Sequence, residues 1–246
     1  MPAHPFNVIA HRGDKVHAPE NTLPAFEAAL ALGADGIELD VRLTRDGVPA
    51  IVHDKDLKRV GGVEWVVEET EWSALRDVPV GERFGPGFPG ARVPRLEEVL
   101  ERFAARIPLE LELKAGAAAP AVVAALRTLG NSEARAKVIV TSFEPEWLAE
   151  VHRLDPEQRV AWLSRRETTE HWGPLERTGA WGWYPHLSEL TPERLAEARR
   201  RGLAVRAWGV KDLAAARAAY ALGAEGCTYD DPGELIAFLK REKLRA

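Results

Sequence analysis

Histidines, carboxylates and basic side chains follow several short apolar segments of this sequence. His11 and Arg12 end the first of these segments, and His53 and Asp54 end a later one. Two histidines in one site can serve as general acid and general base near neutral pH. A planar guanidinium such as that of Arg12 suits a phosphate group. These residue types therefore indicate acid–base chemistry on an anionic substrate.

Carboxylates recur on two other apolar segments at a spacing of two residues. Glu38 and Asp40 lie on one predicted strand, and a second strand carries Glu110, Glu112 and Lys114. Side chains two apart on a strand point to the same face, so each set gathers its charges on one side. In isolation, such a set is more typical of a solvated strand edge than of a metal site. The choice between the two depends on the fold.

Apolar segments rich in Val and Ile alternate with helical patterns along the chain. The expected strands are residues 6–10, 36–42, 49–53, 109–114, 137–141, 159–163, 180–184, 203–208 and 226–229. The expected helices are residues 23–32, 96–106, 120–129, 145–154, 192–201, 213–222 and 233–241. About eight strand–helix units in ~250 residues predict an α/β protein with a TIM (β/α)8 barrel. A doubly wound sheet is the competing fold, but no Gly-x-Gly-x-x-Gly motif follows the first strand.

One region, residues 54–94, breaks this alternation. It is longer than an ordinary connection between a strand and a helix. Its aromatic residues, such as Trp65, Trp72 and Phe84, argue against disorder. We therefore expect residues 1–246 to form a single barrel domain with a small insertion after the second strand region.

The barrel changes the interpretation of the charged segments. Parallel strands in a barrel are buried on both faces, and chemistry lies at their carboxyl ends. Buried carboxylates must be paired or bind an ion, and a hard divalent cation prefers their oxygens. The single cysteine, Cys227, and the lack of a close His-x-His pair make zinc a poorer fit. Together with the cations Arg12 and Lys114, these groups predict metal-assisted hydrolysis of a phosphate ester.

Several short motifs occur in a fixed order along the chain. They are His11-Arg12-Gly13, Ala18-Pro19-Glu20-Asn21-Thr22, Glu38-Leu39-Asp40, Thr44-x-Asp46-Gly47, His53-Asp54, Val93-Pro94-x-Leu96, Leu111-Glu112-Leu113-Lys114, Thr141-Ser142-Phe143 and Trp208. In type and order they resemble the glycerophosphodiester phosphodiesterase family, over almost the whole chain. The ordered N-terminal set is the most specific part of this resemblance.

The resemblance implies a TIM-barrel enzyme that hydrolyses glycerophosphodiesters to glycerol 3-phosphate and an alcohol. It also implies a divalent cation (Mg2+ or Ca2+, or else Mn2+) and attack by the substrate's own 2-hydroxyl through a cyclic phosphate intermediate. By similarity, the metal ligands are Glu38, Asp40 and Glu112, the acid–base pair is His11 and His53, and the phosphate-binding residues are Arg12 and Lys114.

Further residues are expected to complete this site. Trp208, an aromatic residue at a strand end, is expected to line the substrate cavity. Residues expected to support the reacting groups from behind are Glu20, Asn21, Asp54 and Glu110. Of these, Glu20 is expected to orient a metal ligand or a histidine. The sequence leaves open which histidine is the acid and which is the base.

Three positions depart from the family pattern. Glu110 stands where many relatives have Asn, so it either adds a carboxylate beside the metal or pairs with an arginine. Lys211 follows Trp208 at a position where Asn is common, and Tyr229 precedes Asp230 where Thr is common. These positions lie at the expected barrel mouth, so they affect the preference for the leaving alcohol more than the reaction.

The composition excludes several other functions. The 246 residues carry 33 Lys and Arg against 38 Asp and Glu, a formal net charge of −5, and no basic stripe indicates a nucleic-acid partner. No signal-peptide pattern is present, and no apolar run reaches the ~18 residues of a membrane span. We therefore expect a cytoplasmic protein with a small-molecule glycerophosphodiester as partner, and the oligomeric state is open. One Met, one Cys and an excess of Arg over Lys fit a thermophilic source or a GC-rich genome equally well.

Two other functions fit the same scaffold. The aromatic residues of the insertion favour lysophospholipase D-type activity on lipid phosphodiesters. A non-enzymatic protein that binds a phosphorylated metabolite is the second alternative. The intact histidine pair and the complete set of presumed metal ligands argue against it.

Overall fold

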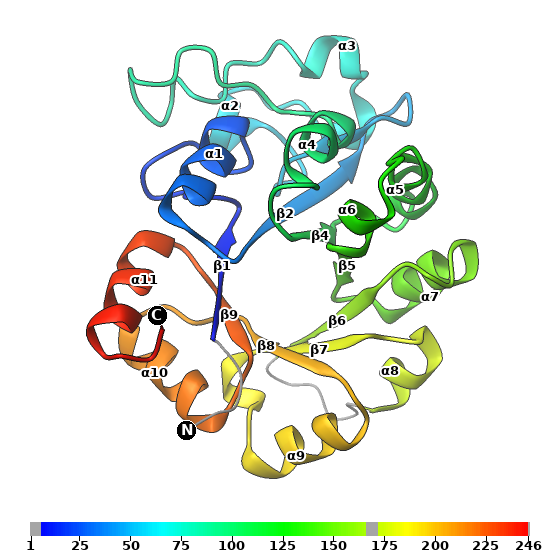
Figure 1. Cartoon of the computed structure of the whole chain (residues 1–246). Coiled ribbons are helices and arrows are strands. Elements are labelled where there is room, and N and C mark those ends of the chain that lie inside the picture. The colour runs from blue at the N-terminus through cyan, green and yellow to red at the C-terminus, as the bar shows by residue number, and fades with distance from the viewer. Residues whose placement is uncertain (1–5, 166–171, 246) are drawn as a thin grey trace.

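Parallel strands close into an eight-stranded barrel in the computed structural model, which describes residues 6–165 and 172–245 (Figure 1). The barrel strands are β1 (Asn7–His11), β2 (Gly36–Leu43), β4 (Leu109–Leu113), β5 (Val138–Ser142), β6 (Val160–Ser164), β7 (Gly182–Pro185), β8 (Ala204–Ala207) and β9 (Gly226–Tyr229). Their order is β1-β9-β8-β7-β6-β5-β4-β2, and the pairing of β1 with β2 closes the ring. The predicted TIM barrel is confirmed.

The short strand expected over residues 49–53 lies outside the barrel. Residues 49–53 contain only the short β3 (Pro49–Ile51), which runs antiparallel to the end of β2. Leu43 pairs with Pro49 across the turn at Gly47, so the two strands form a hairpin that projects beyond the barrel. The sequence placed His53 at the end of this short strand, but β3 ends at Ile51, so His53 lies just beyond it.

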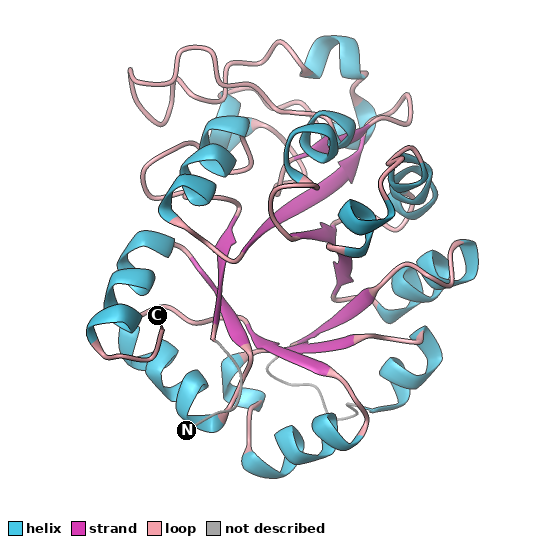
Figure 2. Cartoon of the chain, viewed as in Figure 1, coloured by secondary structure: helices cyan, strands magenta, loops and turns pink. Residues whose placement is uncertain are grey.

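Helices surround the barrel on its outside (Figure 2). They are α1 (Leu23–Leu32), α2 (Lys58–Gly61), α3 (Trp72–Leu75), α4 (Leu96–Phe103), α5 (Ala118–Arg127), α6 (Ser132–Ala136), α7 (Pro145–Leu154), α8 (Trp172–Thr178), α9 (Pro192–Arg200), α10 (Leu213–Leu222) and α11 (Pro232–Arg241), with the 3-10 turns η1 (Val67–Glu69) and η2 (Leu187–Glu189). Local chemistry sets the ends of these helices. Thr22, for example, caps α1 by accepting a hydrogen bond from the backbone of Ala25, and Gly33 ends the helix with a φ of +81°.

Strand β2 shows how the core and the site share one segment. Ile37, Leu39 and Val41 are fully buried in the main apolar cluster, which includes residues of the surrounding helices. Glu38 and Asp40 alternate with them and are also buried, at 6% and 0% exposure. Because successive side chains point to opposite faces, the two carboxylates face the interior of the barrel. The packing of the apolar face therefore fixes the position of the charged one.

The insertion, drawn in cyan to green at the top of Figure 1, is ordered around a small apolar cluster of its own. This cluster consists of Ala50, Val52, Leu57, Val67, Leu75, Val78, Val80 and Val93, with Trp72 packed partly against it. Trp65 and Phe84 are exposed, at 44% and 42%. The region is thus a folded layer of short helices and turns over one side of the barrel.

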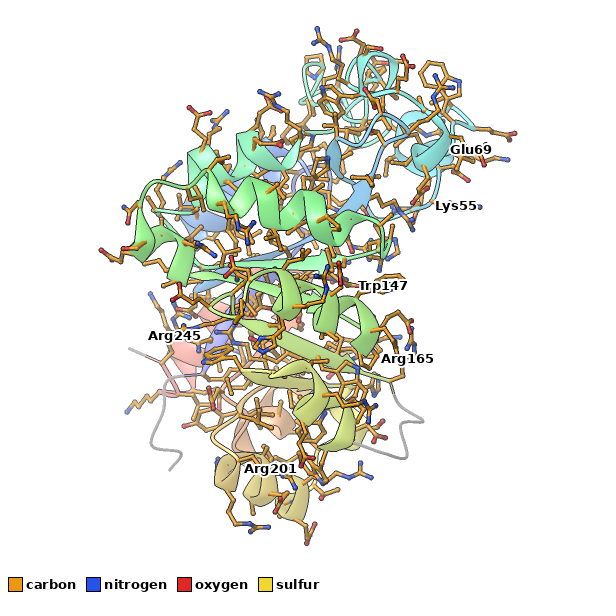
Figure 3. All side chains as sticks on the ribbon, turned by 90° about the vertical axis from the view of Figure 1, so that its right-hand side faces the viewer. Lys55, Glu69, Trp147, Arg165, Arg201 and Arg245 are labelled. Carbon is orange, nitrogen blue, oxygen red and sulfur yellow. The ribbon has the colours of Figure 1, made fainter. Side chains whose placement is uncertain are left out.

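The carboxyl and amino ends of the barrel strands lie at opposite edges of the molecule. In the side view of Figure 3, Trp147 and Arg165, which come after β5 and β6, lie at one edge. Arg245, which pairs with Asp35 just before β2, lies at the opposite edge. Among the described residues, no helix has both the length and the apolar character needed to cross a membrane.

Candidate active site

A cavity of about 310 Å³ opens at the carboxyl ends of the barrel strands. The predicted site residues that line it are His11, Arg12, Glu38, His53, Glu110, Glu112, Lys114 and Trp208. The remaining ones are Glu20, Asn21, Asp40 and Asp54. Each contacts a lining residue through a hydrogen bond or an ion pair. The cavity wall also contains Phe143, Leu163 and Val210, so one side of the cavity is apolar and the other is charged.

Three carboxylates converge on the charged side. Glu38, Asp40 and Glu112 each offer an oxygen atom, and these three atoms lie within 4.8 Å of one another. Glu38 Oε1 and Asp40 Oδ1 are buried and accept no hydrogen bond from any described residue. Buried carboxylate oxygens without donors are costly, and hard divalent cations take oxygen ligands of this kind. The donor set therefore fits a divalent cation.

The pKa values of Glu38 and Glu112 show that the negative charges of this cluster repel one another. Burial raises the pKa of Glu38 well above its usual value, and the nearby charges of Asp40 and Glu112 raise it further. Burial, followed by Asp40, raises the pKa of Glu112 to about 7. Both effects reflect negative charges held together away from water. A bound cation would offset this charge and favour the ionised carboxylates.

Each of the two histidines is held at Nδ1 by an aspartate. His53 Nδ1 lies 2.7 Å from Asp54 Oδ1, and His11 Nδ1 lies 2.6 Å from Asp230 Oδ1. Because an ionised carboxylate only accepts hydrogen bonds, Nδ1 of His53 is the donor toward Asp54, and its Nε2 is left for the cavity. His11 Nδ1 also lies 3.0 Å from Lys15 Nζ, a group that only donates, so the proton position of His11 depends on which of the two partners its Nδ1 bonds. His11 Nε2 lies 3.9 Å from Glu38 Oε2, on the carboxylate side.

The environment of these histidines favours their neutral forms. Burial is the largest effect and lowers the pKa of both His11 and His53. Their aspartate partners oppose this effect but do not reverse it. A neutral imidazole with its Nδ1 proton fixed can accept a proton at Nε2. His53 is therefore arranged to accept a proton at the cavity, and His11 lines the same cavity.

Arg12 reaches the cavity from a sharp turn after β1. Its φ is +61°, in the left-handed region that residues other than glycine seldom adopt, and its backbone nitrogen donates to Glu38 O at 2.9 Å. The next residue, Gly13, has a φ of +81°, and a Cβ there would lie 2.7 Å from the backbone of Ala25. The turn therefore requires glycine at position 13, because a side chain there would collide with the backbone of Ala25.

Two cations flank the carboxylates. Arg12 Nε lies 3.1 Å from Asp40 Oδ2, and its Nη1 donates to Glu20 Oε1 at 2.9 Å. Lys114 Nζ lies 2.7 Å from Glu112 Oε1 and 3.6 Å from Asp40 Oδ1. The surroundings of both cations raise their pKa, since the neighbouring carboxylates outweigh the cost of burial. Positive charge is therefore fixed beside the cavity.

The supporting residues act mainly on the charged side of the site. Asn21 Nδ2 donates to Asp40 Oδ2 at 2.8 Å, so it orients a carboxylate of the cluster. Glu20 contacts Arg12 rather than a metal ligand or a histidine, in contrast to the sequence expectation. Glu110 forms an ion pair with the partly buried Arg206 of β8 and also lines the cavity. The arginine partner that the sequence left open for Glu110 is therefore Arg206.

The apolar side of the cavity is built from aromatic rings. Trp208 packs edge-to-face against Phe143, with ring centroids 5.1 Å apart, and against His186 at 4.7 Å. Its indole nitrogen donates to Ser164 O at 3.0 Å. With its polar atom occupied, the ring presents an apolar surface to the cavity.

Sequence reasoning missed three residues of this site. Asp230 holds His11, Lys15 lies 2.7 Å from Asp230 Oδ1, and Arg59 of the insertion contacts Asp54 and Glu20. Asp230 comes directly after the last strand, in the position where other barrel strands carry functional groups, and that signal was available. Nothing in the sequence near Lys15 or Arg59 indicated their partners.

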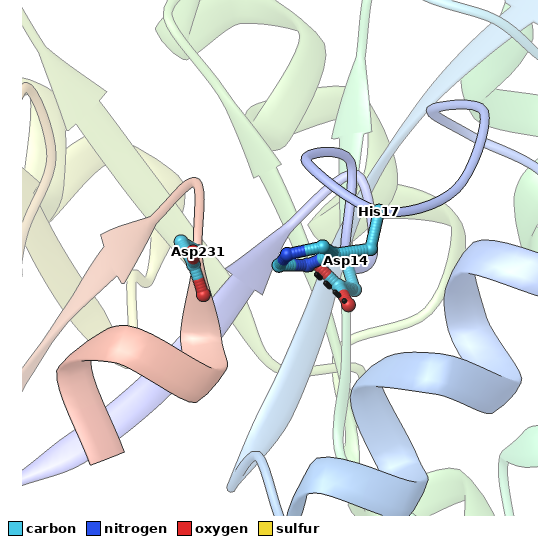
Figure 4. A group of neighbouring side chains, drawn as sticks. All are labelled: Asp14, His17 and Asp231. Atoms are coloured by element: carbon cyan, nitrogen blue, oxygen red, sulfur yellow. Dashed lines mark hydrogen bonds and ion pairs between the residues drawn. The ribbon is translucent and has the colours of Figure 1, made fainter. Parts of the chain in front are cut away.

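A second group of potential ligands lies outside the cavity. Asp14, His17 and Asp231 come together between the loop after β1 and the start of α11 (Figure 4). His17 Nδ1 lies 3.0 Å from Asp14 Oδ1, and Asp231 caps α11 by accepting from the backbone of Glu234. The His17 side chain is 63% exposed. Each of these contacts lies within its own segment, the first in the loop and the second at the start of α11.

A barrel mouth that combines two aspartate-backed histidines, three carboxylates and two cations is the site of an enzyme that acts on a phosphate ester. The comparisons with known proteins specify the class. The model of the glycerophosphoryl diester phosphodiesterase family matches residues 11–234. The chain belongs to this family and is a phosphodiesterase, as the sequence motifs predicted.

Individual relatives match over nearly their full length. The chain is 31% identical over 237 residues to a glycerophosphodiester phosphodiesterase of Caldanaerobacter subterraneus, covering 95% of this chain and 98% of the relative. It is similar to an Oleispira antarctica phosphodiesterase whose structure holds the product sn-glycerol-3-phosphate, with a TM-score of 0.88, 26% identity and coverage of 95% and 96%. A glycerophosphodiester phosphodiesterase of Agrobacterium tumefaciens matches with a TM-score of 0.83, 28% identity and coverage of 94% and 99%.

Proposed function

We propose that this protein hydrolyses glycerophosphodiesters to glycerol 3-phosphate and an alcohol, with a divalent cation and an acid–base pair of histidines. The observation that carries the proposal is the pairing of each histidine, at Nδ1, with an aspartate in one cavity that also holds the carboxylate cluster. The Oleispira relative, with glycerol 3-phosphate as its product, supports the choice of substrate.

Glu38, Asp40 and Glu112 are the proposed ligands of the cation. When bound, a divalent ion supplies Lewis acidity toward the phosphoryl oxygens and neutralises charge that develops on them. Arg12 and Lys114 add fixed positive charge beside the same atoms. Asn21 and Arg12 hold Asp40 in place through its Oδ2 atom, which keeps the cluster in one geometry.

The two histidines divide the proton transfers. One ring accepts the proton of the substrate's 2-hydroxyl at Nε2 while that oxygen attacks phosphorus. The other ring takes up a proton at Nε2 before this step, against the lowered pKa that burial gives it, and then donates that proton to the leaving oxygen. The alcohol departs and a cyclic phosphate remains. In the second half, water attacks the cyclic phosphate and the two rings exchange roles, as microscopic reversibility requires. Asp54 and Asp230 stabilise each imidazolium as it forms.

The apolar wall is proposed to receive the leaving alcohol. Phe143, Leu163 and Trp208 stand opposite the charged side of the cavity, so a substrate bound through its phosphate can extend toward them. Trp65 and Trp72 of the insertion are not among the cavity-lining residues, which weakens the argument for a lipid substrate that their presence in the sequence suggested.

The experiment measures glycerol 3-phosphate release from glycerophosphocholine and glycerophosphoethanolamine. The His11→Ala and His53→Ala variants are expected to lose activity by a factor on the order of 10²–10⁴, as for a general acid or base. Near-normal activity in either variant contradicts the acid–base assignment. Faster turnover of lysophospholipids supports the lysophospholipase D alternative, and tight binding of glycerol 3-phosphate without turnover supports a binding protein.

A further inference from the structure

We propose that Arg59, a residue of the insertion, is a positioning residue for His53, one histidine of the acid–base pair, and for Arg12, the phosphate-binding cation, because it holds His53 through Asp54 and Arg12 through Glu20. This inference rests on the proposed function of that site. It assigns the insertion a role in catalysis although the insertion's aromatic residues do not line the cavity.

The guanidinium of Arg59 binds two carboxylates at once. Its Nε donates to Asp54 Oδ2 at 2.7 Å. Its two terminal nitrogens donate to the two oxygens of Glu20, at 2.6 Å and 2.8 Å. A planar fork with several donors suits this arrangement, whereas the single ammonium of a lysine cannot reproduce it. Arg59 thereby fixes the separation of Asp54 from Glu20.

Each of these carboxylates has a second partner in the site. The other oxygen of Asp54 lies 2.7 Å from His53 Nδ1. Oε1 of Glu20 also accepts from Arg12 Nη1 at 2.9 Å. The hydrogen bonds therefore form two short series, here called the two chains of contacts, and both start at the Arg59 guanidinium. One ends at a histidine and the other at a phosphate-binding arginine.

Glu20 and Asp54 both stay ionised near neutral pH, so the contacts from Arg59 to His53 and to Arg12 are kept there. Burial alone would raise the pKa of Glu20, but hydrogen bonds from Arg59 and Arg12 and their charges lower it to about 2. Asp54 behaves in the same way, with Arg59 and His53 lowering its pKa to about 2 against burial. Both carboxylates are thus ionised near neutral pH and can only accept hydrogen bonds. An ionised Asp54 keeps the proton of His53 on Nδ1.

The fold of the insertion determines where Arg59 lies. The residue belongs to the short α2, whose preceding residue Leu57 is fully buried in the insertion's apolar cluster. Val60, beside it, packs against the same cluster. Its neighbour Lys58 has a side chain that is 68% exposed, and its one ion pair among the described residues is with the exposed Glu64. The two adjacent cations of α2 therefore have different surroundings, and Lys58 is a matched control.

The test compares Arg59→Ala, Arg59→Lys and Lys58→Ala by steady-state kinetics on glycerophosphocholine. Arg59→Ala is expected to lower kcat and raise KM, each by about 10- to 100-fold, since contacts behind a reacting group commonly have effects of this size. Arg59→Lys is expected to recover little of the loss, because one ammonium cannot bridge both carboxylates. Lys58→Ala is expected to leave both constants unchanged. Equal constants for Arg59→Ala and Lys58→Ala would overturn the proposal.

Single changes at the two carboxylates separate the chains. Asp54→Asn is expected to act mainly on kcat, through His53, and Glu20→Gln mainly on KM, through Arg12. Combining Arg59→Ala with either change is expected to add less than the sum of the separate losses, because they remove one connected unit. Full additivity in both combinations would contradict the proposal.

A measurement that does not depend on catalytic turnover distinguishes failure of the Arg59 proposal from failure of the proposed function. Nitrogen-15 spectra of the histidine rings report which nitrogen of His53 carries the proton. We expect the Nδ1–H form of His53 in the wild type and in Lys58→Ala, and a mixture of tautomers in Arg59→Ala. An unchanged spectrum in a folded Arg59→Ala variant would refute the positioning role, whether or not the wild type releases glycerol 3-phosphate.

Discussion

The ion pair between Glu110 and Arg206 provides a quantitative test of how the barrel interior is built. The two side chains are 3% and 12% exposed and belong to β4 and β8. Burial lowers the pKa of Arg206 to about 10, so the guanidinium remains charged near neutral pH. Replacing Glu110 by leucine would leave this charge buried without its carboxylate.

The expected cost comes from separating this charge from its ion-pair partner, which leaves only the longer-range attraction of Glu225 and Asp35 to stabilise it. Removing one partner of a buried ion pair costs about 3–5 kcal/mol. In a chain of this length, each kcal/mol shifts Tm by about 2–4 °C, so Glu110→Leu is expected to lower Tm by roughly 6–20 °C. The double variant Glu110→Leu/Arg206→Leu removes both charges and is expected to lie near the wild type, because apolar replacements of buried pairs are often neutral.

Denaturant unfolding of the wild type, both single variants and the double variant gives the coupling free energy directly. The structure predicts that each single variant is less stable than the double variant. If Glu110→Leu alone costs less than about 1 kcal/mol, Arg206 does not depend on Glu110, and the assignment of this pair is wrong.

Three further predictions concern single residues of the site. Asp230→Asn is expected to lower kcat by about 10- to 100-fold with little change in Tm, since the Asp230 side chain is 58% exposed; equal kcat values for the variant and the wild type would show that His11 is positioned without it. The pKa of Glu20 lies at about 2, below its ordinary value of 4.5, so its contribution to stability is present above pH 4.5 and is lost as the pH falls toward 2. The free energy of unfolding of Glu20→Gln should therefore be lower than that of the wild type at pH 7 and approach it at pH 2, and a gap that does not change with pH argues against the ion pairs. Gly13→Ala is expected to lower stability by at least about 1–3 kcal/mol because of the left-handed backbone, and a variant as stable as the wild type would mean that the turn tolerates a side chain.

Local patterns in the sequence were sufficient for the barrel and for the residues that project from its strands. In β2, the alternation of Ile37, Glu38, Leu39 and Asp40 separates an apolar face from a charged one, and the structure has this arrangement. A period of two is a property of a single strand. The two faces of β2 can therefore be recognised from the sequence without knowing what the strand packs against.

Local sequence patterns could not predict contacts between residues that are far apart in the sequence. Asp230 meets His11 across 219 residues, because β9 pairs with β1 when the barrel closes. Arg59 meets Glu20 across 39 residues. Its helix α2 has four residues, which is too short for a helical period to be recognised. These partners depend on closure of the barrel and on the packing of the insertion, and neither is encoded in local spacing.

We propose that phosphodiester hydrolysis in this cavity requires a divalent cation held by Glu38, Asp40 and Glu112. The most direct measurement is glycerol 3-phosphate release from glycerophosphocholine by protein first treated with a chelator and then supplied with Mg2+, Ca2+ or Mn2+ separately. We expect no release after chelation and restored release with at least one cation. Undiminished release by the chelated protein, without any added cation, would contradict the account.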